Sequence, residues 1–294
     1  MLSVAQRPEA ADEQRPTASR LFVRPRLTAS ISVWSCILFL AALVLLASAP
    51  GLVTEHEPNQ TAIANRLEGP SIAHPFGTDE LGRDVFSRVL HGARVSLVVA
   101  VGATGLALVV GIGIGLAAVW GARVGDVLLM RLVDVALAMP VLVLAMVLVV
   151  AFGSGIPSIV AALGLVSVPE VARLTHAQAR AVSNAEFVTA AIAAGAHPRR
   201  VLLRHIAPNA VSPAIVYSAQ IGAFAILIEA SLSFLGAGLA PPTPTWGGIL
   251  QDGYRILAVN PWPAILPGLV VTATVAAFSL LGDRVALRLN RKAQ

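Results

Sequence analysis

Five long stretches without Asp, Glu, Lys or Arg set the pattern of this chain: Leu27–Thr54, Val95–Ala122, Val135–Pro169, His205–Ile228 and Ile256–Gly282. About 20 mainly apolar residues are needed for a helix to cross a bilayer, so each stretch can hold at least one membrane span. The third stretch contains FGSGIPS at 152–158, a sequence typical of a turn between two helices.

We therefore predict an all-α, polytopic membrane protein with six transmembrane helices at 31–294 and a polar N-terminal tail at 1–30. The overall composition agrees, since 56% of the residues are hydrophobic and only 13% are charged. A soluble domain needs a more polar surface than that. The spans are expected at about 31–50, 95–119, 127–151, 157–177, 210–232 and 264–284.

The distribution of charge predicts the orientation. With six spans both termini lie on one side, and placing them in the cytoplasm puts thirteen basic residues in cytoplasmic segments and five in outer ones. Basic residues favour the cytoplasmic side of membrane proteins. Trp34 and Trp120 then fall near the inner boundary, and Trp246 and Trp262 near the outer one, where indole rings prefer to lie.

The sequence lacks the residues that phosphate-binding loops and common metal sites require. Lys292 is the single lysine and is followed by Ala293, so the chain has no phosphate-binding Gly-Lys-Ser/Thr loop. Cys36 is the single cysteine, and none of the six histidines has another four residues away. We expect no cofactor or metal in this chain, surface roles for the histidines, and no enzymatic activity.

A polar insert at 183–210 interrupts the apolar pattern between the fourth and fifth predicted spans. Ser183 and Glu186 have capping-box spacing, which predicts that a helix begins there. Gly195 suits the left-handed position that ends a helix, and Pro198 suits the first turn of the next one. We expect Pro208 to end that second helix.

The insert presents two kinds of surface. Small side chains make one helical face nearly flat, at Ala190, Ala191, Ala193 and Ala194. Arg199, Arg200 and Arg204 point away from a partial apolar face formed by the second helix. A flat face allows another protein to approach closely, whereas a basic amphipathic helix can also rest on lipid headgroups. The pattern alone leaves both interpretations open.

The insert resembles the coupling loop of ABC-importer permeases, whose pattern is Glu-Ala-Ala, three residues, Gly, nine residues and Ile-x-Leu-Pro. Ala190, Ala191, Gly195 and Pro208 match this pattern at the right spacing. The chain departs from it at three positions: Thr189 replaces the Glu, His205 the Ile and Ala207 the Leu.

Two further blocks resemble the oligopeptide, dipeptide and nickel permeases of the C type. They are HPFGTDELGRDVFSRVLHGARVSL at 74–97 and EASLSFLGAGLAPPTPTWGGIL at 229–250. The resemblance implies a bacterial inner-membrane permease that pairs with a homologous B-type permease, two ATPase subunits and an extracytoplasmic binding protein, with no nucleic acid. ATP and Mg would bind the ATPases, and the expected substrate is an oligopeptide or dipeptide.

By the same resemblance, the ATPase-coupling residues are expected at Glu186, Ala190, Ala191, Gly195, Arg199, Arg204 and Pro208. Nickel or another small solute is the alternative cargo. A proton-coupled secondary transporter that uses Glu229 is a second alternative, because an acid within a membrane span can relay protons. A hydrogen-bonding role for Glu229 near the turn to Pro241 and Pro242 is the expected one.

Other charged residues are expected to pair within their own helices. Glu170 with Arg173, and Arg131 with Asp134, are three residues apart and can meet on one helix face. The outer segment before the second span can contact a substrate-binding protein or act as a gate element through its charged residues Asp79, Glu80, Arg83, Asp84 and Arg88. The expected role is instead a self-capped helix, with Thr78 as N-cap and Glu80, Asp84 and Arg88 on one face. Pro140 should kink the third span, and Gly111, Gly113 and Gly115 favour close helix contact in the second.

Overall fold

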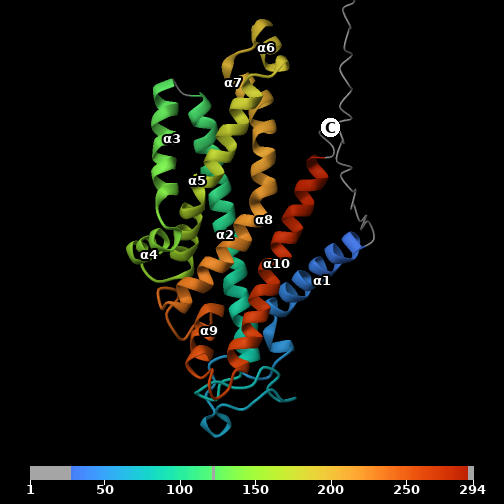
Figure 1. Ribbon diagram of the computed structural model, residues 1–294, viewed down its shortest axis with the longest axis vertical. Helices are drawn as coiled ribbons and strands as arrows, with labels where there is room; N and C mark the ends of the chain where they lie inside the picture. Colours follow the sequence, from blue (N-terminus) through green and yellow to red (C-terminus); the bar gives the residue numbers. More distant parts are fainter. Residues whose placement is uncertain (1–27, 121–122, 291–294) are drawn as a thin grey trace, which may run out of the picture.

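The computed structural model describes residues 28–120 and 123–290, and these residues form helices joined by turns. Labelled as in Figure 1, the helices are α1 (Thr28–Ser48), α2 (Val85–Trp120), α3 (Arg123–Ala138), α4 (Val141–Phe152), α5 (Ile156–Ser183), α6 (Glu186–Ala193), α7 (Pro198–Val201), α8 (Ala207–Phe234), α9 (Trp246–Arg255) and α10 (Trp262–Asn290). A π-helix, Leu202–Ile206, joins α7 to α8, and 3₁₀ turns lie at Pro50–Leu52 and Ile63–Asn65. The predicted all-α class is confirmed, whereas the tail prediction falls mostly outside the described residues.

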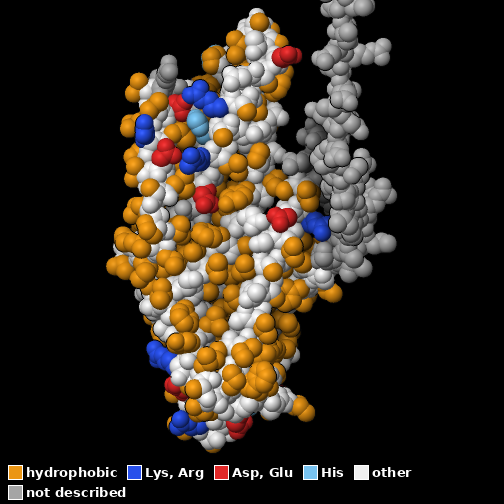
Figure 2. All heavy atoms as spheres, viewed as in Figure 1, with side chains coloured by type: hydrophobic (Ala, Val, Ile, Leu, Met, Phe, Trp, Pro, Cys, Tyr) orange, Lys and Arg blue, Asp and Glu red, His pale blue; other side chains and the backbone are white. Residues whose placement is uncertain are grey.

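The long helices run together along the long axis of the molecule (Figure 1). Helices α6 and α7 protrude at one end, here called the elbow end, and α9 lies toward the other, the α9 end. The segment between α1 and α2 also lies at the α9 end. Figure 2 shows hydrophobic side chains over the middle of the visible face, with most charged side chains nearer the two ends.

Four described helical segments are long and apolar enough to cross a membrane: Val85–Trp120, Ile156–Ser183, Pro198–Phe234 and Trp262–Leu287. Helices α3 and α4 together make a possible fifth, and the apolar part of α1, Val33–Ser48, is shorter. The chain is therefore a multi-pass membrane protein, and the count of six spans stays a prediction.

Pro140 breaks the third predicted span. Helix α3 ends at Ala138 and α4 begins at Val141, and their axes are bent by 100°. Proline lacks an amide hydrogen and its ring clashes with the carbonyl four residues earlier, which kinks or breaks a helix. Pro140 breaks its helix, whereas α5, α8 and α10 continue through Pro169, Pro213 and Pro267. Pro140 adopts φ −58° and ψ 121°, which turns the chain out of the helical path. The predicted kink at Pro140 is confirmed, and it is sharp enough to divide the segment into two helices.

The two central helices, α2 and α5, pack closely because glycines remove side-chain bulk between them. A Cβ atom on Gly111 would lie 2.6 Å from the Cβ of Val171, and one on Gly115 would lie 2.7 Å from the carbonyl oxygen of Ala172. Gly113 faces open space, with no heavy atom within 4 Å of its would-be Cβ. Two of the three predicted contact glycines therefore serve close packing.

We expect Gly115→Ala to destabilise the protein by about 1–3 kcal/mol, because the added methyl group overpacks the α2–α5 contact. Gly113→Ala is the matched control and should leave stability unchanged or slightly higher, since alanine favours helix and the space is open. Thermal unfolding of both variants in the same detergent measures the difference. Equal stability of the two would contradict the packing assigned to Gly115.

Candidate functional site: the elbow and the α9-end cavity

The elbow, residues 184–208, is held by backbone geometry at its bend. Gly195 has φ +80°, its amide donates to the Ile192 carbonyl at 2.9 Å, and the Ala196 amide donates to the Ala191 carbonyl at 3.1 Å. These two bonds form a Schellman motif, which requires a left-handed residue at the glycine position. The prediction that Gly195 ends a helix in the left-handed conformation is confirmed.

Helix α7 begins as predicted, with Pro198 in its first turn. The preceding residue, His197, is its N-cap, and His197 Nδ1 accepts a hydrogen bond from the Arg199 amide at 3.3 Å. The bend therefore lies between Gly195, which favours the end of a helix, and Pro198, which favours the first turn of the next.

The predicted capping box at Ser183 is wrong. Helix α5 continues through Ser183, whose hydroxyl donates to the Ala179 carbonyl at 2.6 Å. Helix α6 begins at Glu186 after Ala185, which makes no side-chain capping bond. Serine inside a helix can satisfy its hydroxyl on the carbonyl four residues earlier, and that bond replaces the cap here.

Pro208 does not end the second helix, contrary to the prediction. The π-helix Leu202–Ile206 lies just before it, and the chain stays helical from Pro198 to Phe234. A π turn changes the hydrogen-bond spacing, so a proline after it can sit in a new first turn. The Asn209 side chain donates to the His205 carbonyl at 2.7 Å, which satisfies one acceptor of the altered turn.

One side of the elbow is packed onto the bundle. Val188, Val201 and Ile206 are buried together with Ala179 of α5 and Ala210 of α8. Leu116 and Val119 of α2 pack against this cluster. The elbow is therefore fixed to the ends of three long helices.

The other side of the elbow is exposed and partly apolar. Phe187, Ile192 and Leu203 are 49%, 59% and 65% exposed. The sequence-predicted site residues lie on this protruding element: Glu186, Ala190, Gly195, Arg199, Arg204 and Pro208 are exposed, and Ala191 is half-buried. A buried base and an exposed apolar tip are suited to contact with another protein.

Ion pairs near the elbow end join different helices. Asp126 of α3 is buried and contacts His176 of α5, with 2.8 Å between Oδ1 and Nε2. Its other oxygen pairs with Arg180. The sequence alone does not reveal this cluster, because Asp126 and Arg180 are 54 positions apart.

The two predicted pairs within helices are wrong. Arg173 pairs with Asp134 across α5 and α3, at 3.7 Å, and Glu170 accepts a hydrogen bond from the Tyr217 hydroxyl at 3.2 Å. Correct spacing on one helix permits a pair but does not decide between neighbours on the same helix and on adjacent ones.

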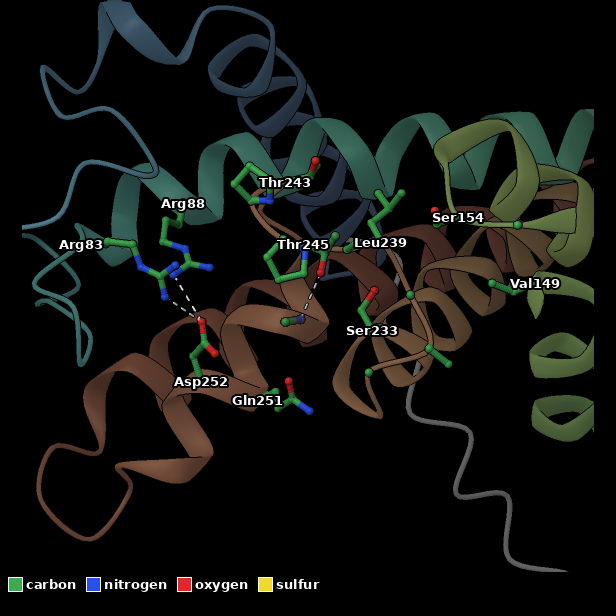
Figure 3. Close-up of a pocket in the computed structure, with 18 of the residues that line it drawn as sticks. Arg83, Arg88, Val149, Ser154, Ser233, Leu239, Thr243, Thr245, Gln251 and Asp252 are labelled. Carbon is green, nitrogen blue, oxygen red and sulfur yellow. Dashed lines mark hydrogen bonds and ion pairs between the residues drawn. The ribbon is translucent and has the colours of Figure 1, made fainter.

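A cavity of about 710 Å³ opens at the α9 end. Its lining comes from four places: the approach to α2 with the first turn of α2, the end of α4 with the α4–α5 turn, the end of α8 with the turn after it, and α9 (Figure 3). The labelled residues include Arg83, Arg88, Thr243, Gln251 and Asp252.

Four charged side chains form a network beside this cavity. Asp79 Oδ2 lies 2.7 Å from Arg83 Nε and 2.7 Å from Arg88 Nη1. Asp252 of α9 lies 3.0 Å from Arg83 Nη2 and 3.3 Å from Arg88 Nη1. The network joins the segment before α2 to α9.

The predicted helix start at Thr78 is wrong. Helix α2 begins at Val85, and Asp84 caps it by accepting from the Ser87 amide at 2.6 Å. Thr78 is fully buried and donates to the Asn65 carbonyl. His74 was expected at the surface but is buried, with Nδ1 3.0 Å from Asp84.

Two buried residues fasten α2 to the neighbouring elements. Glu229 of α8 is fully buried and accepts hydrogen bonds from Ser96 of α2 and Ser233 of α8, both at 2.9 Å, in line with the expected hydrogen-bonding role. Trp246 is also fully buried, and its Nε1 donates to the Val89 carbonyl at 3.0 Å. The indole ring of Trp246 is thus enclosed by protein, so it does not meet lipid as indole rings at a membrane boundary do. Among the described residues no cluster of His, Cys, Asp and Glu could hold a metal ion.

Comparison with known proteins adds a family and several relatives. Residues 92–294 match the family model described as "Binding-protein-dependent transport system inner membrane component". The chain is 39% identical over 248 residues to a putative peptide transport system permease protein of Brucella suis, covering 84% of this chain and 83% of that protein.

Two other relatives differ in their named cargo. A dipeptide transport system permease of Alkalihalophilus pseudofirmus is 36% identical over 256 residues, covering 87% of this chain and 84% of the relative. A glutathione transport system permease of Pectobacterium atrosepticum is 35% identical over 286 residues, covering 97% of this chain and 95% of the relative.

The buried base of the elbow gives a local prediction. We expect Val188→Ala to raise the hydrogen-exchange rate of α6 amides, because about 2 kcal/mol of packing is lost at a fully enclosed position. Ile192→Ala, on the exposed side of the same helix, is the control and should leave exchange unchanged. Faster exchange in the control alone would show that the base of α6 is not its anchor.

Proposed function

This chain belongs to the family of binding-protein-dependent transport system inner membrane components, and we propose that it forms half of the translocation path of an ATP-driven peptide importer. It is a permease subunit of an ABC importer, and its similar proteins are named for peptide, dipeptide and glutathione transport. The observation that carries the proposal is the elbow, which has a base packed on three long helices and an exposed apolar tip.

The elbow is proposed to dock on an ATPase subunit. Phe187, Ile192 and Leu203 supply exposed apolar area, and Ala190 leaves room for close approach. Arg199 and Arg204 are exposed beside them and can pair with acidic side chains of the partner. Glu186, Ala191, Gly195 and Pro208 complete the proposed coupling surface.

Transport then follows from linkage between two sites. ATP shifts the assembly only if it binds one arrangement of the ATPases more tightly than the other. The docked elbow moves with its ATPase and carries α5 and α8 with it, because Ala179 and Ala210 belong to the elbow's buried base. The change in helix arrangement opens the path toward one side of the membrane.

The proposed assembly contains a homologous B-type permease, two ATPases and an extracytoplasmic binding protein. ATP and Mg bind the ATPases, and this chain performs no chemistry. We place it in the bacterial inner membrane with both termini in the cytoplasm, which the thirteen-to-five distribution of basic residues favours. The elbow end is then cytoplasmic and the α9 end faces outward.

Two alternative functions differ in testable ways. A nickel or other small-solute importer has the same subunit architecture and differs in its binding protein. A proton-coupled transporter would rely on Glu229, but both carboxylate oxygens of that residue already accept bonds from serine hydroxyls and the side chain is fully buried. Uptake that persists without ATPases and stops with a proton uncoupler would favour that alternative.

We expect Gly195→Val to uncouple ATP hydrolysis from peptide uptake. The left-handed backbone at this position strains any β-branched residue, so the bend between α6 and α7 changes shape. Uptake by cells and ATPase activity of the purified assembly are the measurements, and uptake should fall at least about tenfold, which corresponds to about 1.4 kcal/mol of lost coupling.

Gly125→Val is the matched control, because Gly125 lies in α3 with no heavy atom within 4 Å of its would-be Cβ. This variant should retain both uptake and hydrolysis. Normal uptake by Gly195→Val, with the chain present in the membrane at its usual level, would count against the proposed coupling.

A further inference from the structure

Arg88 carries hydrogen-bonding capacity that the fold does not use. Its side chain is 8% exposed, and both of its ion pairs, to Asp79 and Asp252, involve Nη1. Nε is buried and has no hydrogen-bond partner among the described residues. Arg83 and Arg88 both line the cavity and both contact Asp252, so a ligand oxygen there can approach the same guanidinium groups.

The two acids of the network have different roles. Asp79 is fixed, since its side chain is 4% exposed and also accepts from the Leu81 and Arg83 amides at 2.9 and 3.0 Å. Asp252 comes from α9, is 32% exposed and also lines the cavity. Asp79 therefore holds Arg83 and Arg88 in place, while Asp252 occupies a position that another carboxylate can take.

The wall beside these arginines is formed by backbone with free hydrogen-bonding groups. Residues 238–244 include Pro241, Pro242 and Pro244 and form no helix or strand. In the part of the chain that the structure describes, no hydrogen bond is found for the backbone of this stretch. Residues 238–243 are half-buried or exposed, so their carbonyl groups and the amides outside the prolines are open to hydrogen bonds from a ligand in the cavity.

We propose that the α9-end cavity binds the carboxyl-terminal end of a short peptide, with Arg83 and Arg88 binding the carboxylate in place of Asp252. The backbone of 238–244 pairs with the peptide groups of the ligand. The choice of peptides rests on the proposed function. The volume of about 710 Å³ is within the range for small-molecule sites. Recognition through a terminus and a backbone accepts many side chains.

Protection of a cysteine tests the site without requiring transport. A Cys36→Ser background removes the single native cysteine, and Thr243→Cys places one on the cavity wall. The chain is assembled with its partner subunits in nanodiscs without ATP, and maleimide labelling is followed by mass spectrometry. Dialanine and trialanine, at about ten times their half-protecting concentrations, should slow labelling about tenfold, because only unoccupied sites react.

Further controls test whether protection depends on the C-terminal carboxylate of the peptide and on Arg83. The C-terminal amides of the same peptides should not protect, since they lack the anion. Val259→Cys, 73% exposed at the same end but outside the cavity lining, should label equally with and without peptide. Arg83→Ala should abolish protection, whereas Arg255→Ala, on α9 but outside the cavity lining, should retain it.

The opposite results would overturn the site. Equal protection by peptide and amide would remove the role of the arginines, and a Thr243→Cys thiol that never reacts in the assembly would mean that a partner chain fills the cavity. No protection in an assembly that still hydrolyses ATP and imports peptide would refute this site while leaving the proposed function intact.

Asp252→Asn should lower the half-protecting concentration of the peptide, because a neutral side chain no longer competes for the arginines. A higher half-protecting concentration would contradict the replacement of Asp252 by the peptide carboxylate.

Discussion

The unbroken helical backbone from Pro198 to Phe234 is the constraint on which the rest of this structure depends. Inside a bilayer every backbone donor and acceptor must be satisfied within the protein, so a chain that enters from the elbow has to remain helical. The π-helix makes this possible in spite of Pro208. As a result, Val201, Ile206 and Ala210 of the elbow's buried base lie on the same continuous element as the carboxylate of Glu229.

The two ends of the molecule are stabilised by different interactions. A small apolar cluster around Val188 and Val201 holds the elbow, and its strength depends on close packing. At the α9 end, the ion pairs of Arg83 and Arg88 with Asp252, together with a buried Trp246, join α2 and the segment before it to α9. Arginine pairs of this kind have defined directions, so they fix the position of a cavity wall more specifically than apolar contact does.

The sequence predicted features that depend on one residue and its immediate neighbours. The positive φ at Gly195, the helix start at Pro198 and the disruption at Pro140 follow from the covalent structure of glycine and proline. The helical class followed from the long uncharged stretches. These effects are local, but a proline alone does not decide the outcome, since the helix predicted to end at Pro208 continues past it.

Features that depend on a choice between partners could not be predicted. Ser183 could cap a new helix or bond within the old one, and packing of Val182 and Ala179 on the elbow favours the longer α5. Arg173 had an acid three residues away and another on α3, and only the arrangement of α3 beside α5 decides between them. Most of the lining of the α9-end cavity lies in the blocks at 74–97 and 229–250 that the sequence singles out, but that these blocks meet each other and the α4–α5 turn depends on how the helices pack.

The π-helix also has a mechanical consequence. It is a short stretch of altered hydrogen bonding at the base of a helix of 28 residues, α8, whose length at 1.5 Å per residue is about 42 Å. If flexing is confined to that one turn, a tilt of about 10° there displaces the far end of α8 by about 7 Å. Because the π-helix lies at one end of α8, a small rotation there at one membrane surface becomes a larger displacement of α8 at the other. That displacement is about as wide as an extended peptide chain.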